Sequence, residues 1–425
     1  MALANHDGSL GECGAGPCRC VRFRSNSSIL ELTVAFKNDK ADKKVNLGVG
    51  AYRDETGKPW VLPAIRESKK LLLNDPEVDH EYLPIAGYAP YLKASGELLF
   101  GADASAVKEN RLVTNQTISG SGANHIGAEF VSKFYQFPTD KKVIYVSKPT
   151  WPNHFAIMHA GGLETVEYRY YDEKTRGLDF EGLKASLRDA PDGSVVLLHA
   201  CAHNPTGVDP NEAQWKELAE LFKEKKLFAF FDCAYQGFAS GDPVRDAFAV
   251  RYFESQKTIP MLVCQSYAKN AGLYGERIGA LHVVVQKSEE VPKVQSQLNA
   301  LQRSEISTCP AFGARLVANV LTKPELLEQW HKDIQTMAHR IIAMRKELYN
   351  LLVNKYKTPG TWNHIVDQTG MFSFLGLNTD QCDRLVKDGH IYLVKTSRIS
   401  MAGLNPSNVD YVAQWIDQVV RDAKL

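Results

Sequence analysis

The stretch Met261-Leu262-Val263-Cys264-Gln265-Ser266-Tyr267-Ala268-Lys269-Asn270 decides the fold of this chain of 425 residues. Its first four residues form an apolar run typical of a buried strand. Lys269 follows that run, with a hydroxyl three residues before it at Ser266 and a guanidinium eight residues after it at Arg277. We therefore expect Lys269 to emerge where the end of a sheet meets a pocket.

These residue types suit a phosphorylated aldehyde. The amine of Lys269 can form a Schiff base with the aldehyde, while Ser266 and Arg277 can hold the phosphate. This arrangement predicts pyridoxal phosphate as the cofactor. Two other interpretations are a solvated surface lysine and the S-x-x-K motif of serine acyl-enzymes. The acyl-enzymes also carry S-D-N and K-T-G motifs, and neither occurs in this sequence.

Working outward, short β-branched and aromatic runs alternate with helical patterns. The predicted strands cover residues 143–146, 165–168, 195–198, 228–231 and 261–264. This alternation predicts an α/β fold with helices packed on a largely parallel sheet. Between two of the strands, the pattern from Trp215 to Phe222 predicts a helix with Asp209-Pro210 as its cap and first turn. A long amphipathic pattern over 322–356 predicts a helical spine towards a C-terminal unit, and a last helix follows Asn405-Pro406.

Composition limits the possible partners. With 44% apolar residues the chain can bury a large core, and its length allows two domains. Lys and Arg number 50 against 49 Asp and Glu, so no bulk charge favours nucleic acid or an anionic membrane. No apolar run reaches the roughly 18 residues of a membrane helix. We expect a soluble protein whose partners are small molecules, with no nucleic acid and no membrane.

The first 27 residues differ from the rest. Cys13, Cys18 and Cys20 lie in a Gly-rich head, but no neighbouring residues complete a zinc site. We expect residues 1–27 to form a flexible arm and the protein to bind no metal. The eight cysteines are too sparse for a disulfide scaffold and indicate a reducing compartment. The predicted location is the cytoplasm, with the mitochondrial matrix as the alternative because this head also carries several arginines.

Asp232 ends one of the most apolar predicted strands. A carboxylate there is costly to bury unless a cation or several donors meet it. A pyridinium nitrogen would be such a cation, and an ordinary Lys or Arg is the alternative.

Two further motifs follow predicted strands. Asn204-Pro205-Thr206-Gly207 is typical of a turn. The side-chain amide of Asn204 could also donate to a cofactor oxygen. Ser119-Gly120-Ser121-Gly122 opens a helical stretch, where free backbone amides suit a phosphate, although the glycine spacing does not match a dinucleotide fingerprint. For His199 and His203, which flank a strand end, we expect structural roles rather than metal ligation.

Seven segments together resemble, in order, the eukaryotic-type aspartate aminotransferases of the class I pyridoxal phosphate-dependent family. They are Gly48-Val49-Gly50-Ala51-Tyr52-Arg53, Glu81-Tyr82-Leu83-Pro84-Ile85, Pro149-Thr150-Trp151-Pro152-Asn153-His154, His199-Ala200-Cys201-Ala202-His203-Asn204-Pro205-Thr206-Gly207, Ala234-Tyr235-Gln236-Gly237-Phe238, the Lys269 segment and Gly370-Met371-Phe372-Ser373. The resemblance covers about residues 28–425. It implies the fold of type I pyridoxal phosphate transferases, with a mostly parallel seven-stranded sheet in the large domain. Residues 61–330 would form that domain, and residues 28–60 and 331–425 would form a smaller α/β domain.

The resemblance also implies a role for each matching residue. Lys269 would be the Schiff-base lysine and the catalytic base, aided by Asp232, Tyr235 and Trp151. The cofactor would be bound by Ser119, Gly120, Ser121, Trp151, His154, Asn204, Asp232, Tyr235, Ser266, Lys269 and Arg277, and by Tyr82 of a partner subunit. The substrate would be bound by Gly50, Trp151, Asn204, Phe372 and Arg398, with Arg303 of the partner on its distal carboxylate.

Several positions depart from the family pattern: Ser121 replaces the usual Thr, Ala271 and Gly275 replace larger residues near the lysine, and Ser397 replaces the Gly before Arg398. Asn124-His125 stands where the family usually has Leu-Arg, and the segment from Arg303 to Pro310 lacks the usual Ser-Asn-Pro-Pro ending. The expected activity is reversible transfer of the amino group from L-aspartate to 2-oxoglutarate through a pyridoxamine phosphate form, in a homodimer with shared sites. The alternatives are an aromatic or broad-specificity aminotransferase, and a non-catalytic descendant. The presence of Lys269, Asp232, Tyr235 and Arg398 argues against the last.

Overall fold

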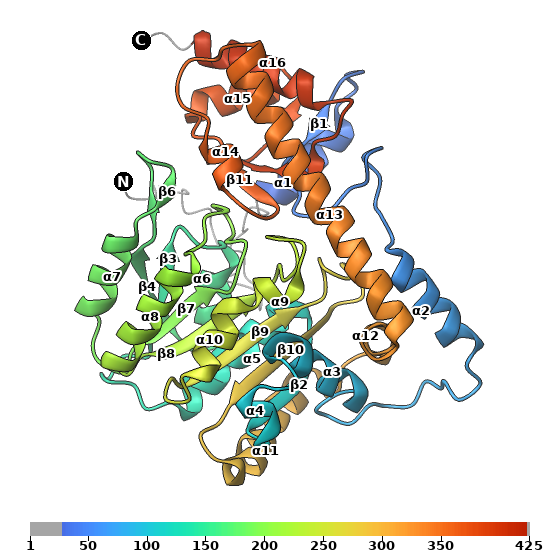
Figure 1. Ribbon diagram of the computed structural model, residues 1–425, viewed down its shortest axis with the longest axis vertical. Helices are drawn as coiled ribbons and strands as arrows, with labels where there is room; N and C mark the ends of the chain where they lie inside the picture. Colours follow the sequence, from blue (N-terminus) through green and yellow to red (C-terminus); the bar gives the residue numbers. More distant parts are fainter. Residues whose placement is uncertain (1–27, 423–425) are drawn as a thin grey trace, which may run out of the picture.

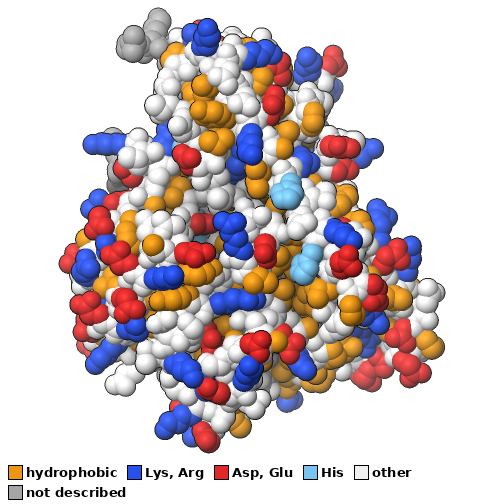
Figure 2. Space-filling view, in the orientation of Figure 1, with side chains coloured by type: hydrophobic (Ala, Val, Ile, Leu, Met, Phe, Trp, Pro, Cys, Tyr) orange, Lys and Arg blue, Asp and Glu red, His pale blue; other side chains and the backbone are white. Residues whose placement is uncertain are grey.

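The structure is a computed structural model that describes residues 28–422. The predicted flexible arm, with its three cysteines and arginines, lies outside the described residues. None of the helices in the described part is both long and apolar enough to cross a membrane. On the face in Figure 2, acidic and basic side chains are interspersed, in line with the nearly balanced composition.

A seven-stranded sheet forms the centre of the larger unit (Figure 1). Its order is β2 (Leu112–Ile118), β10 (Ile278–Val284), β9 (Met261–Ser266), β8 (Phe228–Cys233), β7 (Val195–His199), β3 (Val143–Lys148) and β4 (Glu164–Arg169). Only β10 runs antiparallel to its neighbours. The expected mostly parallel seven-stranded sheet is therefore confirmed, and all five predicted strands lie in it.

Helices cover both faces of this sheet. On one face lie α7 (Phe180–Asp189), α8 (Glu212–Glu224) and α10 (Phe248–Ser255). The other face carries α5 (Ser119–Phe134), α6 (Asn153–Ala160) and α11 (Val291–Ile306). Because both faces are covered, β7, β8 and β9 are buried along their whole length, which explains their continuous apolar sequences.

The predicted cap of α8 is wrong. The helix begins at Glu212, and its cap is Asn211, whose side chain accepts from the backbone N–H of Gln214 while the Gln214 side chain accepts from the Asn211 N–H. Asp209 lies before this capping box and accepts bonds from the loop that follows β7 instead.

A smaller unit is built around α13 (Pro324–Asn350), the predicted spine. In it, β1 (Val45–Asn46) pairs with β12 (Ile391–Tyr392), and β11 (Phe372–Phe374) pairs with β13 (Arg398–Ser400). Helices α15 (Thr379–Lys387) and α16 (Val409–Arg421) complete it. Segments from both ends of the chain thus meet in one unit (Figure 1). The exact domain boundaries stay a prediction.

The remaining α-helices and strands belong to the smaller unit (α1 and α14), connect the two units or extend the larger one. They are α1 (Ser28–Asn38), α2 (Pro63–Asn74), α3 (Ala89–Phe100), α4 (Ser105–Lys108), β5 (Tyr171–Asp172), β6 (Gly177–Leu178), α9 (Pro243–Asp246), α12 (Ala311–Thr322) and α14 (His364–Asp367).

Candidate functional site

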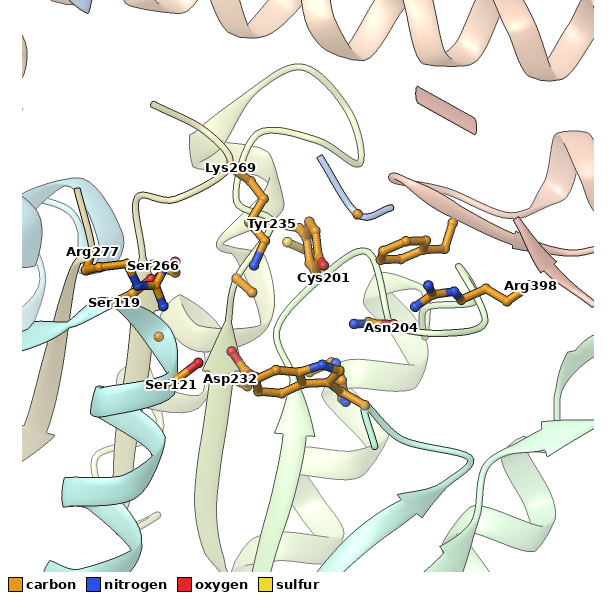
Figure 3. A pocket seen from close by; sticks show the side chains of 16 residues that line it. Ser119, Ser121, Cys201, Asn204, Asp232, Tyr235, Ser266, Lys269, Arg277 and Arg398 are labelled. Atoms are coloured by element: carbon orange, nitrogen blue, oxygen red, sulfur yellow. Dashed lines mark hydrogen bonds between the residues drawn. The ribbon is translucent and has the colours of Figure 1, made fainter. Parts of the chain in front are cut away.

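A cavity of about 200 Å³ lies at the carboxyl ends of β7, β8 and β9. Parallel sheets place ligands at this edge. The residues that line it are Gly50, Ser119, Gly120, Ser121, Trp151, His199, Cys201, Asn204, Asp232, Ala234, Tyr235, Ser266, Lys269, Arg277, Phe372 and Arg398. Figure 3 shows their side chains converging on one space.

Lys269 enters the cavity from the turn after β9, as its position behind the apolar run predicted. Its ammonium nitrogen lies 4.9 Å from the centre of the Tyr235 ring. Burial lowers the pKa of Lys269, although the charge of Asp232 works in the opposite direction. A lowered pKa makes the neutral, nucleophilic amine more available than it is in an exposed lysine.

Asp232 has two carboxylate oxygens in different surroundings. Oδ2 lies 2.9 Å from Nε2 of His154, which donates to it when it carries the proton. Oδ1 is buried and has no hydrogen-bond donor. Burial by itself would raise the pKa of Asp232, but the hydrogen bond and charge of His154 outweigh it, and the pKa is lowered. The result is a carboxylate that lines the cavity and has one oxygen without a partner (Figure 3).

A chain of buried side chains supports this carboxylate from behind. Nδ1 of His154 lies 2.8 Å from the Thr150 hydroxyl, which in turn lies 3.1 Å from Nε2 of His199. Burial lowers the pKa of His199 to about 3, so this imidazole is neutral at neutral pH. The His154 ring is therefore fixed in place from both sides.

One end of the cavity suits an oxyanion. It is formed by the start of α5, where Ser119 has a left-handed φ of 59° and its hydroxyl lies 3.2 Å from that of Ser266. A Cβ on Gly120 would meet the Ser266 side chain at 3.1 Å, so glycine keeps this corner open. Arg277 lies beside these groups (Figure 3). Hydroxyls, free helix amides and a guanidinium together fit a phosphate group.

The opposite end holds Arg398 (Figure 3). This side chain is buried, donates to the carbonyl of Gly48 over 2.8 Å, and leaves its Nε without a partner. The Phe372 ring lies against the guanidinium, 4.3 Å from its centre. Gly50 allows this packing, because a Cβ there would come within 2.8 Å of Phe372. The free donors of Arg398 suit a carboxylate.

Asn204 and Tyr235 line the wall between the two ends. Asn204 is buried at the start of a cis Asn204-Pro205 bond, and its Oδ1 has no donor. Burial is the main cause that raises the pKa of Tyr235 well above its usual range, so the phenol keeps its proton and can donate. The side chains of Asn204 and Tyr235 line the middle of the cavity, together with Asp232, and a guanidinium group lies at each end. This arrangement fits a flat phosphorylated ring such as pyridoxal phosphate.

Most of the predicted site residues meet in this cavity. His154 does not line it but acts on it through Asp232. Tyr82, 83% exposed, and Arg303, at the exposed end of α11, lie outside the cavity of their own chain, and their action in a partner subunit stays a prediction.

The sequence interpretation missed two lining residues, Cys201 and Ala234, and gave His199 only a structural role. Cys201 and Ala234 could have been predicted as lining residues from their positions, because they lie just after the apolar runs of β7 and β8 and within motifs that the sequence analysis quotes.

Comparisons with known proteins agree with this geometry. The mitochondrial aspartate aminotransferase of Xenopus tropicalis is 49% identical over 393 residues, which cover 92% of this chain and 91% of that protein. The structure of the aspartate aminotransferase from Saccharomyces cerevisiae cytoplasm superposes with a TM-score of 0.92 at 45% identity, covering 95% of this chain and 98% of the other.

An aromatic-amino-acid aminotransferase from Burkholderia pseudomallei, covalently bound to pyridoxal phosphate, superposes with a TM-score of 0.91 at 40% identity, covering 94% of this chain and 98% of the other. A family model described as aminotransferase class I and II matches residues 42–416. Because this match spans most of the chain and the relatives are similar along nearly their whole length, the chain belongs to the class I and II aminotransferases.

Proposed function

We propose that this chain is an aspartate aminotransferase that uses pyridoxal phosphate to move the amino group of L-aspartate to 2-oxoglutarate. The observation that carries this proposal is the unpartnered Oδ1 of Asp232, a residue that lines the same cavity as Lys269. When bound, the cofactor would supply an aldehyde that takes up the amino group and a protonated ring that accepts electrons from the substrate.

The residues of this chain hold the cofactor at three points. Ser119, Ser266 and Arg277 bind the phosphate. Asp232 keeps the ring nitrogen protonated, because a buried carboxylate stabilises a neighbouring positive charge. Tyr235 and Asn204 would bind the ring oxygen, and Trp151, which lines the same cavity, would contact the ring.

Lys269 and Arg398 act on the substrate. Arg398 binds the α-carboxylate with its free donors and so fixes the Cα near the Lys269 amine. That amine, whose pKa is lowered by burial, takes the proton from Cα and returns it later in the reaction.

The distal carboxylate of aspartate requires a second cation. Among the residues that line the cavity of one chain, the arginines are Arg277 and Arg398, and both already have a partner in this proposal. We assign the role of the second substrate-binding cation to Arg303 of a partner subunit, in a homodimer with shared sites. Two guanidinium groups facing two carboxylates select for dicarboxylic amino acids and 2-oxo acids.

An aromatic or broad-specificity activity is the second candidate. It is favoured by the similarity to the aromatic-amino-acid aminotransferase and by the departure of the Arg303 segment from the family pattern. For the compartment we keep the cytoplasm as the proposal. The relatives include a mitochondrial and a cytoplasmic enzyme.

The test has two steps. Borohydride reduction of the purified protein followed by peptide mapping should label Lys269, and Lys269→Ala should abolish both labelling and activity, whereas Lys148→Ala, at an exposed lysine, should change neither. A panel of amino donors with 2-oxoglutarate should then give the highest kcat/KM for aspartate. Preference for phenylalanine or tyrosine would support the second candidate, and label on another lysine would refute the assigned site.

A further inference from the structure

A second cluster of titratable side chains lies outside the cavity, where α5 packs against α11 (Figure 1). His125 and Glu129 lie four residues apart on α5 and so share one face of that helix. Glu305 comes from the last turn of α11. One ligand atom of each of these three side chains lies within 4.8 Å of the others.

The contacts of this cluster leave one carboxylate oxygen without a donor. Nε2 of His125 lies 2.8 Å from Oε1 of Glu305. Lys133 binds Oε1 of Glu129 over 2.5 Å. The other oxygen, Oε2 of Glu129, is buried and has no hydrogen-bond partner. Two carboxylates therefore face each other beside an imidazole, and a buried acceptor remains open.

We propose that His125, Glu129 and Glu305 bind a divalent transition-metal ion, with Zn²⁺ the best match. One imidazole nitrogen and two carboxylate oxygens are ligands that this class of ion accepts, whereas Mg²⁺ and Ca²⁺ prefer oxygen alone. Within the described residues, no other group of His, Cys, Asp or Glu has three ligand atoms so close together.

The geometry allows such an ion. Two ligands bound at about 2.1 Å cannot lie more than about 4.2 Å apart, so side-chain rotations of roughly 1 Å bring the three atoms around one ion. All three side chains are partly buried, with 32% of His125, 21% of Glu129 and 25% of Glu305 exposed. Water or a partner subunit can complete the coordination. Lys133, half exposed, can move away from Glu129 when the ion binds.

His125 and Glu305 lie on two different helices, α5 and α11. An ion bridging them would tie α5, which begins at the phosphate end of the cavity, to the end of α11 that carries Arg303.

The proposal is tested on the full-length chain with Cys13, Cys18 and Cys20 replaced by serine, because free thiols take up added zinc even where no built site exists. After treatment with a chelator, zinc chloride is added, and zinc per chain and its Kd are measured by dialysis with elemental analysis and by calorimetry. The test variants are His125→Gln and Glu305→Gln, and the matched control is His159→Gln, at an exposed histidine at the end of α6.

We expect one zinc ion per chain, a Kd raised at least tenfold by each test variant, and no change in the control. Binding that is absent, or that is equal in all variants, overturns the proposal. Crystals of the unmodified chain soaked in zinc provide an answer that does not depend on how the variants fold. An anomalous peak between the three side chains supports the site, and peaks only elsewhere refute it.

Discussion

The free oxygen of Asp232 is the most informative single atom in the site. A buried carboxylate oxygen without a donor is costly, so a protein keeps one where a ligand completes it. His154 holds the other oxygen and keeps the group ionised. The proposed ring nitrogen is the cation that this atom lacks.

Asp232→Asn is expected to lower kcat by about 10- to 100-fold while the fold is retained. The amide occupies the same space but cannot hold a positively charged ring nitrogen, and a hydrogen bond to a charged group contributes about 1.5–3 kcal/mol. Replacing the cofactor with its N-methylated, permanently cationic analogue should recover part of the rate. If the analogue recovers nothing and the melting temperature falls sharply, Asp232 is a structural carboxylate.

At the scale of elements, two loops from different units are joined directly behind the cavity. The loop after β7 carries Asn204, and the loop before β11 leads to Phe372. Asp209 accepts from the N–H groups of Ala202 and His203, at 2.6 and 2.9 Å, and from the Thr369 hydroxyl at 3.1 Å. These hydrogen bonds fix the loop of Asn204, the proposed partner of the ring oxygen, relative to the loop that leads to Phe372 at the Arg398 end of the cavity.

Asp209→Asn is expected to raise the KM for aspartate and to lower kcat/KM about tenfold. An amide supplies only one acceptor oxygen, so at least one of the three donors loses its partner, a loss of about 1–3 kcal/mol. Steady-state kinetics measure the effect. The matched control is Asp172→Asn, which removes a similar set of turn contacts to Lys174 and Thr175 on the surface. Equal losses in the two variants would mean that the joint between the loops has no role in substrate binding.

The inner strands also carry a histidine that responds to pH. His282 on β10 lies between the Thr114 hydroxyl, at 2.9 Å, and the side-chain oxygen of Gln265, at 3.0 Å. Burial lowers the pKa of His282 from 6.5 to about 3. Between these two values the unfolded chain binds a proton and the folded chain does not, so stability is lost as the pH falls from about 6.5 towards 3.

His282→Gln should therefore reduce the acid sensitivity of the fold. At pH 5 the neutral histidine costs about 2 kcal/mol relative to pH 7.5, and the variant lacks this term. Denaturant unfolding at both pH values gives the change in free energy for each protein. The expected result is a drop smaller by about 2 kcal/mol in the variant, whatever its stability at pH 7.5. An identical drop would show that His282 does not contribute to acid denaturation.

At the scale of the whole molecule, the cavity of one chain holds only part of the proposed machinery. Tyr82 is largely exposed, and Arg303 lies on the exposed end of α11, outside the cavity. An isologous dimer would bring each of these residues to its partner's cavity and make two composite sites at once.

Complementation tests the shared sites. Dimers of Lys269→Ala and of Arg303→Ala should each be nearly inactive towards aspartate, because every site lacks either the base or the distal cation. Mixing, unfolding and refolding the two variants should create hybrids in which one site has both residues, and aspartate activity should return. Hybrids that form without activity would show that Arg303 does not act across an interface. A wild-type mixture treated in the same way controls for refolding.

The sequence by itself determined the central sheet and the main chemical residues. The three runs at 195–198, 228–231 and 261–264 are so apolar that they suit a sheet covered on both faces, and polar residues directly after such runs lie at its edge. Lys269, Asp232 and Asn204 were found in this way. Local pattern was sufficient because these residues are positioned by the strands that precede them.

Only the tertiary structure decided how these side chains are paired. It placed Nε2 of His154 on one oxygen of Asp232, left the other free, and assigned Asp209 to a loop rather than to the cap of α8. It also brought His125 and Glu129 within reach of Glu305. Each of these is a contact between groups whose spacing along the chain does not specify their separation in space. Such contacts are set by the packing of whole helices and strands, which no local pattern encodes.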